Sequence, residues 1–268
     1  MSATSTTPTP AGTTDKLTQA VGIDIIPGAI GLRRVRALRE AELRAGATWF
    51  RSLMLGTFTE ALPVARPCLG VMLLSGWRSS DERTAFHDTD AFRDLQRHPR
   101  FVSLDLGSGV ARSQHRDLTL EDDGWLERLP AGRAPRGVMA GLTYARLTPR
   151  GVLPFQRMAR AVTLSARQQE GFIASAFATE FRYPVFRVMS LTLWEHRAYS
   201  QQWAYSGEVH MRAINWLFDK PDLMPGGCVG RFPILGVAGK LDGVDLSTAI
   251  RAAESKPRPK RAMTTADA

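Results

Sequence analysis

The sequence contains little cysteine. Two of its 268 residues are cysteines, Cys68 and Cys228, and neither belongs to a CxxC motif. A disulfide framework of the kind found in small secreted proteins is therefore excluded, and a reducing compartment is the expected setting. The missing CxxCH motif also excludes covalent attachment of a c-type haem.

Long apolar runs are missing as well. No run approaches the roughly 20 residues that a membrane-spanning helix needs. Met1–Leu17 is rich in Ser, Thr and Pro, and it lacks the basic start and apolar centre of a secretory signal. We therefore expect a cytoplasmic protein, either free in solution or bound peripherally to a membrane.

Several catalytic and binding templates are absent. No GxSxG nucleophile elbow and no glycine signature of a dinucleotide-binding sheet is present. The sequence shows no HExxH or HxxxH arrangement and no zinc-finger spacing, so a metal held by protein ligands alone is not expected. Besides His210, the sequence contains four histidines, and none of them belongs to such an arrangement: His87, His98, His115 and His196.

Positive charge and apolar residues are abundant. The formal net charge is +9, and hydrophobic residues make up 44% of the chain. The charge favours anionic surfaces, including anionic lipid, but no nucleic-acid-reading signature accompanies it, so nucleic-acid binding is not expected. The run KPRPKR at Lys256–Arg261 is read either as a solvated tail or as a segment that binds lipid or acidic partners.

One pattern occurs twice. Val71–Trp77 and Val188–Trp194 are apolar runs that end in Trp. Helical patterns follow them at Asp81–Leu95 and Tyr199–Phe218. The repeat predicts a pseudo-symmetric α+β fold; a parallel α/β sheet is the alternative, which the missing glycine signature disfavours.

The hydrophobic periodicity predicts the remaining elements and the domain boundaries. We expect a disordered N-terminal tail over 1–29, a first half over 30–116, a linker over 117–137, a second half over 138–240 and a basic flexible tail over 241–268. The expected strands are 30–38, 70–77, 101–106, 138–147, 186–194 and 232–237. The expected helices are 39–55, 81–95, 157–177 and 199–218.

His210 is the candidate cofactor ligand. In a helix over 199–218 it shares an apolar stripe with Trp203, Gly207 and Ile214. A histidine there is either a hydrogen-bonded core residue or an iron ligand. Gly207 would leave room for a flat macrocycle, and Trp203 and Ile214 would form apolar walls.

Other residues are weaker candidates. Cys228 is read either as a loop residue or as a thiolate iron ligand. His196 follows a strand end, where turn histidines usually face water. Arg212, Arg187 and His196 are candidates for polar contacts around the cofactor, because the Arg fork suits carboxylates. A cluster of phenylalanines in the second half forms either core or an apolar substrate pocket: Phe155, Phe172, Phe177, Phe181 and Phe186.

Four segments carry a resemblance to a known family. They are LLSGWRSSDERTAF (Leu73–Phe86), GLTYARLTP (Gly141–Pro149), FRYPVFRVMSLTLWEH (Phe181–His196) and SGEVHMRAI (Ser206–Ile214). In these segments the chain resembles the spheroidene monooxygenase family, the acyclic carotenoid 2-ketolases, over roughly 70–106 and 140–235. The family pattern differs before His210, where this chain has Glu208 and Val209 in place of Gly-Pro.

The resemblance implies a fold and a function. The fold would be two ferredoxin-like halves of the dimeric α/β-barrel type. The reaction would be haem-dependent oxygen insertion into a linear carotenoid to give a ketone, with His210 as the axial iron ligand and electrons from a ferredoxin-type donor. An anionic membrane surface and a second copy of the chain are further partners to consider.

Two other functions stay open. One is a different haem enzyme on the same scaffold, such as a dehydratase acting at an N–O bond or an enzyme that uses peroxide. The other is a cofactor-free ferredoxin-like monooxygenase or binding module. In the last case the protein would be colourless, and loss of the His210 side chain would change nothing.

Overall fold

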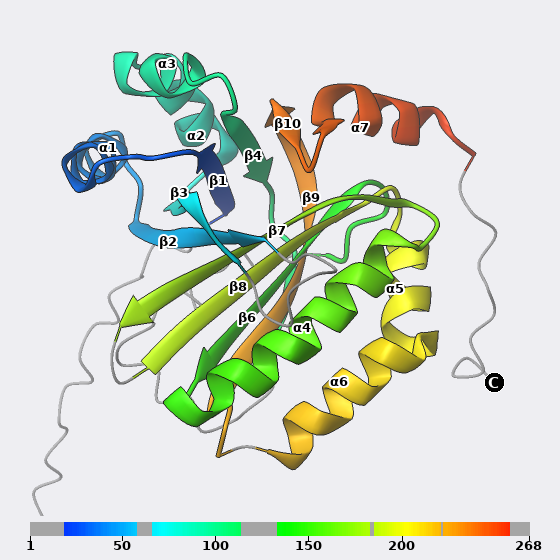
Figure 1. Ribbon diagram of the computed structural model, residues 1–268. Helices are drawn as coiled ribbons and strands as arrows, with labels where there is room; N and C mark the ends of the chain where they lie inside the picture. The colour runs from blue at the N-terminus through cyan, green and yellow to red at the C-terminus, as the bar shows by residue number, and fades with distance from the viewer. Residues whose placement is uncertain (1–18, 58–65, 114–132, 183–184, 221, 258–268) are drawn as a thin grey trace, which may run out of the picture.

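Eight antiparallel strands form a closed barrel in the computed structural model, which describes residues 19–57, 66–113, 133–182, 185–220 and 222–257 (Figure 1). Neighbouring strands pair in the order β4-β1-β3-β2-β7-β8-β6-β9, and β9 pairs again with β4. The barrel therefore closes within one chain, and the predicted α+β class is confirmed. The strands are β1 (Ala20–Pro27), β2 (Trp49–Thr57), β3 (Arg66–Trp77), β4 (Val102–Leu106), β5 (Val110–Ser113), β6 (Met139–Leu147), β7 (Phe172–Arg182), β8 (Val185–Trp194) and β9 (Gly226–Ala238), with a small separate pair, β10 (Lys240–Leu241) and β11 (Val244–Asp245).

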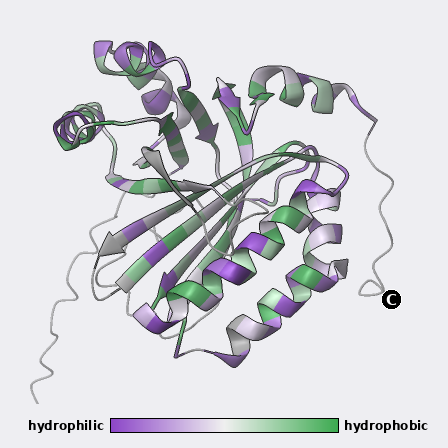
Figure 2. Cartoon of the chain, in the orientation of Figure 1, coloured by the Kyte–Doolittle hydropathy of each residue, from purple (hydrophilic) through white to green (hydrophobic). Residues whose placement is uncertain are grey.

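Helices cover the outside of the barrel in two groups. The first group, α1, α2 and α3, lies over the strands of the first half (Figure 1). The second group, α4, α5 and α6, lies over β6, β7 and β8. Green and purple residues alternate along α4 and α6 in Figure 2, as expected for helices with one buried face. The helices are α1 (Leu32–Arg44), α2 (Ser80–His87), α3 (Asp90–Gln96), α4 (Val152–Arg167), α5 (Arg197–Ser206), α6 (Glu208–Asp219) and α7 (Leu246–Ser255).

The barrel interior is a packed apolar core. Successive strand residues point to opposite faces, so Leu142 and Tyr144 of β6 point inward, whereas Gly141 and Thr143 point outward toward the helices. Both inward residues are at most 4% exposed. Because the interior is filled, any ligand site of the second half must lie outside the barrel, between its strands and the helices.

The predicted N-terminal tail over 1–29 is wrong in its last part. Ala20–Pro27 forms β1, which pairs with both β3 and β4 and is buried along nearly its whole length. Its apolar residues on the inner face, Val21, Ile23 and Ile25, alternate with Gly22 and Asp24 at the strand period, so the sequence carries a strand signal here. Residues 1–18 lie outside the described part of the chain.

Three glycines divide segments that the periodicity alone joins. The predicted helix over 39–55, and the strand predicted before it over 30–38, are instead α1 followed by β2. The chain turns between them at Gly46, whose φ of +112° suits glycine alone. Gly171, with φ +72°, likewise separates α4 from β7 within the helix predicted over 157–177. Gly207 separates α5 from α6 within 199–218.

Two further boundaries differ from the predictions. The helix expected over 81–95 is two helices, because Thr89 caps α3 by accepting a hydrogen bond from Phe92 N at 3.3 Å. The tail predicted over 241–268 begins instead with the β10–β11 pair and α7, whose Leu246 and Ile250 pack on the barrel core. The predicted linker over 117–137 lies mostly outside the described residues, as does 258–268.

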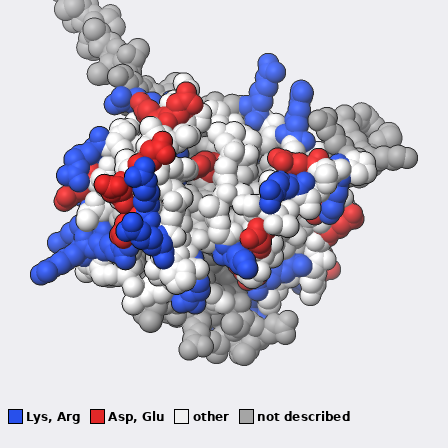
Figure 3. Space-filling view, turned by 90° about the horizontal axis from the view of Figure 1, so that it is seen from above, with Lys and Arg blue, Asp and Glu red and all other residues white. Residues whose placement is uncertain are grey.

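The surface carries charges of both signs. Seen from above, Lys and Arg side chains are interspersed with Asp and Glu (Figure 3). Helix α1 contributes several exposed arginines, one of which pairs with a carboxylate of α3, Arg34 Nη2 with Asp94 Oδ2 at 2.7 Å. Within the described residues, no helix is long and apolar enough to cross a membrane.

Candidate functional site

A cavity of about 370 Å³ lies between the outer face of the second-half strands and helices α4, α5 and α6. Its volume lies within the range of small-molecule sites, and its walls are mostly apolar. Side chains of all three helices and of β6, β7, β8 and β9 line it. The apolar wall residues include Phe155, Met158, Val162, Phe177, Val188, Ala213 and Ile214.

Short side chains on the strands leave this space open. Gly141 and Thr143 of β6 lie beside Thr192 and Ser190 of β8, with which they pair, and all four line the cavity. They occupy the outward positions of strands whose inward positions hold large core residues such as Leu191. The floor of the cavity is therefore a small patch of hydroxyl groups in an otherwise apolar surface.

His210 lies in the first turn of α6 and faces the cavity. Its Nδ1 lies 2.8 Å from the carbonyl oxygen of Ala204. A carbonyl oxygen only accepts, so Nδ1 carries the proton and Nε2 keeps its lone pair. Burial lowers the pKa of His210, with a smaller contribution in the same direction from the charge of Arg231. The imidazole is therefore held neutral, in the tautomer whose Nε2 can bind a metal.

Trp203 and Ile214 also line the cavity, as the predicted stripe requires. The ring centroid of Trp203 lies 4.3 Å from that of His210, although a helix break separates the two residues. Trp203 Nε1 donates to Ser165 Oγ of α4 at 3.1 Å, which fixes the indole. Three of the five predicted site residues thus lie together.

Gly207 and Arg212 do not line the cavity. Gly207 joins α5 to α6, and a Cβ there would lie 2.5 Å from the Trp203 carbonyl oxygen, so its small size serves the helix junction. The side chain of Arg212 is 70% exposed and lies 3.7 Å from Glu208. The predicted stripe assumed one unbroken helix over 199–218. Helical spacing does not place Gly207 on the cavity face, because the helix breaks at this residue.

The weaker candidates also lie elsewhere. Cys228 belongs to the packed barrel interior, where burial raises the pKa of its thiol to about 12, so a thiolate is disfavoured. Arg187 is buried, and its Nη1 lies 3.8 Å from Glu180 Oε2. Of the phenylalanines, Phe155 and Phe177 line the cavity, whereas Phe172 packs on Trp194. The side chain of Phe181 lies outside the described part.

Arg231 is a cavity residue that the sequence reasoning missed. It lies on β9, directly opposite Gly141 of β6, and its guanidinium stacks on Tyr205 at the end of α5. Its Nη2 donates to the Tyr205 hydroxyl at 3.0 Å. The signal that could have found it is the period-2 alternation of β9, which places Arg231 on the same outward face as Val229.

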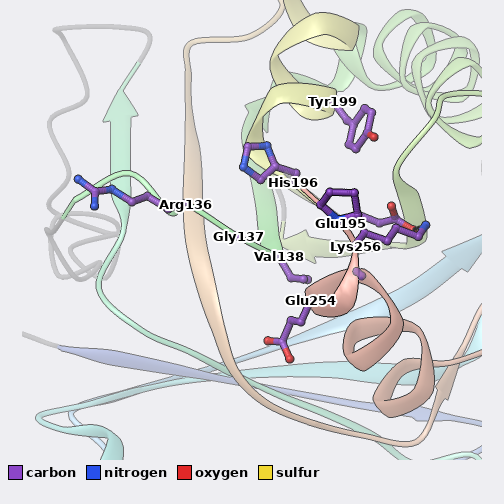
Figure 4. Close-up of a pocket in the computed structure, with 10 residues that line it drawn as sticks. Arg136, Gly137, Val138, Glu195, His196, Tyr199, Glu254 and Lys256 are labelled. Atoms are coloured by element: carbon purple, nitrogen blue, oxygen red, sulfur yellow. Dashed lines mark hydrogen bonds and ion pairs between the residues drawn. The ribbon is translucent and has the colours of Figure 1, made fainter. Parts of the chain in front are cut away.

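A second cavity, of about 410 Å³, lies where α7 meets the start of α5 (Figure 4). Several of its polar groups have partners within the protein. Lys256 Nζ contacts Glu195 Oε1 at 2.5 Å, Tyr199 donates to Glu170 at 2.9 Å, and His196 Nδ1 accepts from Ala198 N at 3.0 Å. His196 is thus the N-cap of α5. The open imidazole nitrogen and apolar walls of the first cavity favour it as the ligand site.

In the first half, a buried polar cluster fills the space between strands and helices. Arg83 of α2 is 1% exposed and pairs with Asp24 Oδ1 at 2.7 Å and with Asp105 Oδ1 at 2.8 Å. Burial alone would lower the pKa of Arg83, but the charges of Asp24 and Asp105 outweigh it and raise that pKa. Glu42 of α1 is fully buried beside them, and burial, aided by the charge of Asp24, raises its pKa to about 8.

Glu42 makes stability depend on pH. Its carboxyl takes up protons more readily in the folded state than in the unfolded state, where its pKa is 4.5. The contribution of the protonated Glu42 carboxyl to the free energy of unfolding is complete below pH 4.5 and is lost as the pH rises to about 8. Glu42→Gln should therefore flatten the decline of unfolding free energy between these values, as measured by urea denaturation. Glu40→Gln, an exposed change on the same helix, should leave the decline as in the wild type.

The donor set of the first cavity limits what it can hold. Among the described residues, no group of three or more His, Cys, Asp or Glu side chains could hold a metal ion. A single neutral imidazole in an apolar slot instead fits a metal that brings its other ligands with it, as haem iron does. The residues present thus fit a haem with one histidine ligand.

No family model matches the chain, and no curated protein matches its sequence. Solved structures are similar in fold. The aldoxime dehydratase OxdRE in complex with butyraldoxime is 11% identical, with a TM-score of 0.50 over 82% of this chain and 80% of that chain. The haem-degrading enzyme LmHde of Listeria monocytogenes is 11% identical over 79% and 99% of the two chains, with a TM-score of 0.29. At such identities the likeness extends to the fold alone.

Proposed function

We propose that this protein is a haem-dependent oxidoreductase in which His210 is the axial iron ligand. One observation carries the proposal: a neutral imidazole, oriented by the Ala204 carbonyl, faces an apolar cavity with Nε2 available. Within the described residues, no hydrogen-bond partner is found for Nε2. A histidine whose only role was in the core would more commonly satisfy both ring nitrogens.

The cavity residues have definable roles toward such a group. Trp203 and Ile214 would pack on the macrocycle beside His210, and Phe155 and Val188 would exclude water from it. When bound, haem supplies the redox chemistry. On the opposite, strand side, the polar groups are Arg231 and the hydroxyls of Thr143, Ser190 and Thr192. The three hydroxyls lie on β6 and β8. They can orient a polar substrate atom, but they are poor bases, so the residues mainly position an apolar molecule.

We also propose that the barrel consists of two ferredoxin-like repeats, which explains why one half alone holds the cavity. The order strand-helix-strand-strand-helix-strand runs from β1 to β4 and again from β6 to β9. Asp24 pairs with Leu73 in the first half, as Thr143 pairs with Ser190 in the second. The large residues of the first half thus correspond to short ones in the second, and the space that opens is the proposed haem site.

For the substrate we propose a linear carotenoid or a similar long isoprenoid. Dioxygen would be the oxidant that supplies the ketone oxygen, and a ferredoxin-type donor would supply the electrons that reduce its other oxygen atom to water. The resemblance of the four sequence segments and the apolar walls support this choice. A cavity of about 370 Å³ is too small for the full length of such a molecule. The remainder would extend into solvent, a partner or a membrane surface.

A dehydratase acting at an N–O bond is the second candidate. The fold similarity to a dehydratase bound to butyraldoxime favours it. A short aldoxime would fit the cavity, and loss of water from it needs no electron donor. Turnover assays on a haem-loaded protein separate the two: product from an aldoxime without reductant supports the dehydratase, and ketone formed only with a reductant supports the monooxygenase.

The proposal is tested by titrating the purified protein with haemin and recording the absorption spectrum. We expect a saturable Soret band in the wild type that is lost or shifted in His210→Ala, because the variant has no axial nitrogen. His196→Ala, outside the cavity, is the matched control and should bind like the wild type. A wild type without a saturable band would leave a cofactor-free enzyme or binding module. A band unchanged in His210→Ala would exclude His210 as the ligand.

A further inference from the structure

Arg231 brings a positive charge to the edge of the apolar cavity. It is the one Lys, Arg, Asp or Glu among the described residues that line this space. The guanidinium carbon lies 5.7 Å from the centre of the Tyr205 ring, and Tyr205 is 57% exposed. The guanidinium is therefore held at the rim, where the cavity meets solvent, while the space behind it is apolar.

This charge lacks a counterion in the described part of the chain. The tyrosine hydroxyl accepts one hydrogen bond from Nη2, and no carboxylate lies within salt-bridge distance among the described residues. A guanidinium has five N–H donors in a planar fork, so most of them remain available. At the matching register of the first half, Gly22 faces a carboxylate, Asp105, where Gly141 faces Arg231. A positive charge at this strand position thus occurs only in the half that holds the cavity.

We infer that Arg231, positioned by Tyr205, binds a carboxylate of the molecule whose apolar body occupies the cavity. The planar fork suits a carboxylate bidentately, and the rim position leaves the anion partly hydrated while the apolar part is buried. The inference rests on the proposed function in one respect: haem, with its two propionates, is the first source of such a carboxylate. An apolar substrate acid is the other source.

The test compares haemin with haemin dimethyl ester, which has no free carboxylate, in the wild type, Arg231→Gln and Tyr205→Phe. Arg231→Gln should lower the affinity for haemin about 10- to 100-fold, the range expected when a hydrogen-bonded charge pair is lost. The ester should bind the wild type and Arg231→Gln with similar affinity. Tyr205→Phe, which keeps the ring and removes one acceptor, should lower the affinity for haemin less than Arg231→Gln does. Arg231→Lys, which keeps the charge and loses the fork, should rescue binding in part.

The outcomes separate this inference from the haem proposal. A saturable Soret band with equal affinity for haemin and its ester, unaffected by Arg231→Gln, overturns the carboxylate site and leaves the haem site in place. Equal weakening of both ligands also overturns it, because the effect would then be structural. If haemin does not bind at all, the proposed function fails, and cis-parinaric acid is compared with its methyl ester. Acid-selective binding that Arg231→Gln abolishes supports the inference, and its absence overturns it.

Discussion

Replacing Ser190 with phenylalanine should abolish saturable haemin binding while the protein stays folded. Ser190 lies on the cavity floor, opposite the helices, and is half-buried there. An aromatic ring at this position would project into the space that a macrocycle needs. The apo protein should tolerate it, because filling a cavity is neutral or stabilising when no native contact is displaced. In the first half, the residue at the matching register, Leu73, is 1% exposed between strands and helices.

Two measurements decide this prediction. Haemin titration should show no saturable Soret band in Ser190→Phe, and urea denaturation should give an unfolding free energy no lower than that of the wild type. Ser190→Ala is the matched control, which removes the hydroxyl without filling the space and should bind haemin. If Ser190→Phe binds haemin with wild-type affinity, the ligand lies elsewhere, and the cavity at α7 is the next site to test.

Five strands, β3, β4, β6, β8 and β9, were predictable from sequence, whereas β1, β2, β5 and β7 and the helix boundaries were not. Apolar runs such as Val188–Trp194 fix a buried strand because every inward residue is large. Helical periodicity, by contrast, continues across a break when the next element is also amphipathic, as between α5 and α6. The positive φ of Gly46 and Gly171, which ends two of the predicted helices, is visible in the sequence only as a glycine.

Which residues line the cavity was predictable in part from helical spacing, and not where the lining depends on the sheet. His210 and Trp203 were identified from their spacing, and they meet even though the helix breaks between them. Arg231 enters the cavity because β9 pairs with β6, a contact between segments far apart in sequence. The pairing partner of a strand cannot be read from its own alternation. The hydroxyl patch of β6 and β8 was missed for the same reason.

Replacing Arg83 with methionine should destabilise the protein by about 3–5 kcal/mol, the usual cost of breaking a buried ion pair by removing one partner. Asp24, which is 1% exposed, would lose its cation and keep a charge that burial penalises. Ser103 Oγ would lose a hydrogen bond from the same guanidinium, at 3.1 Å. The three aromatic rings that surround the guanidinium, Trp77, Phe86 and Phe92, would lose their cation–π contacts.

Urea denaturation of Arg83→Met beside two further variants separates the causes of that loss. Arg93→Met breaks an exposed pair with Asp90 and should change the unfolding free energy by less than about 1 kcal/mol. Adding Asp24→Asn to Arg83→Met should recover part of the stability, because it removes the unpaired buried charge. If the double variant is no more stable than Arg83→Met, the destabilisation comes from lost packing against the aromatic rings and not from the unpaired charge. In either case Arg83 lies between the strands and helices of the first half, in the layer where the second half has the cavity around His210.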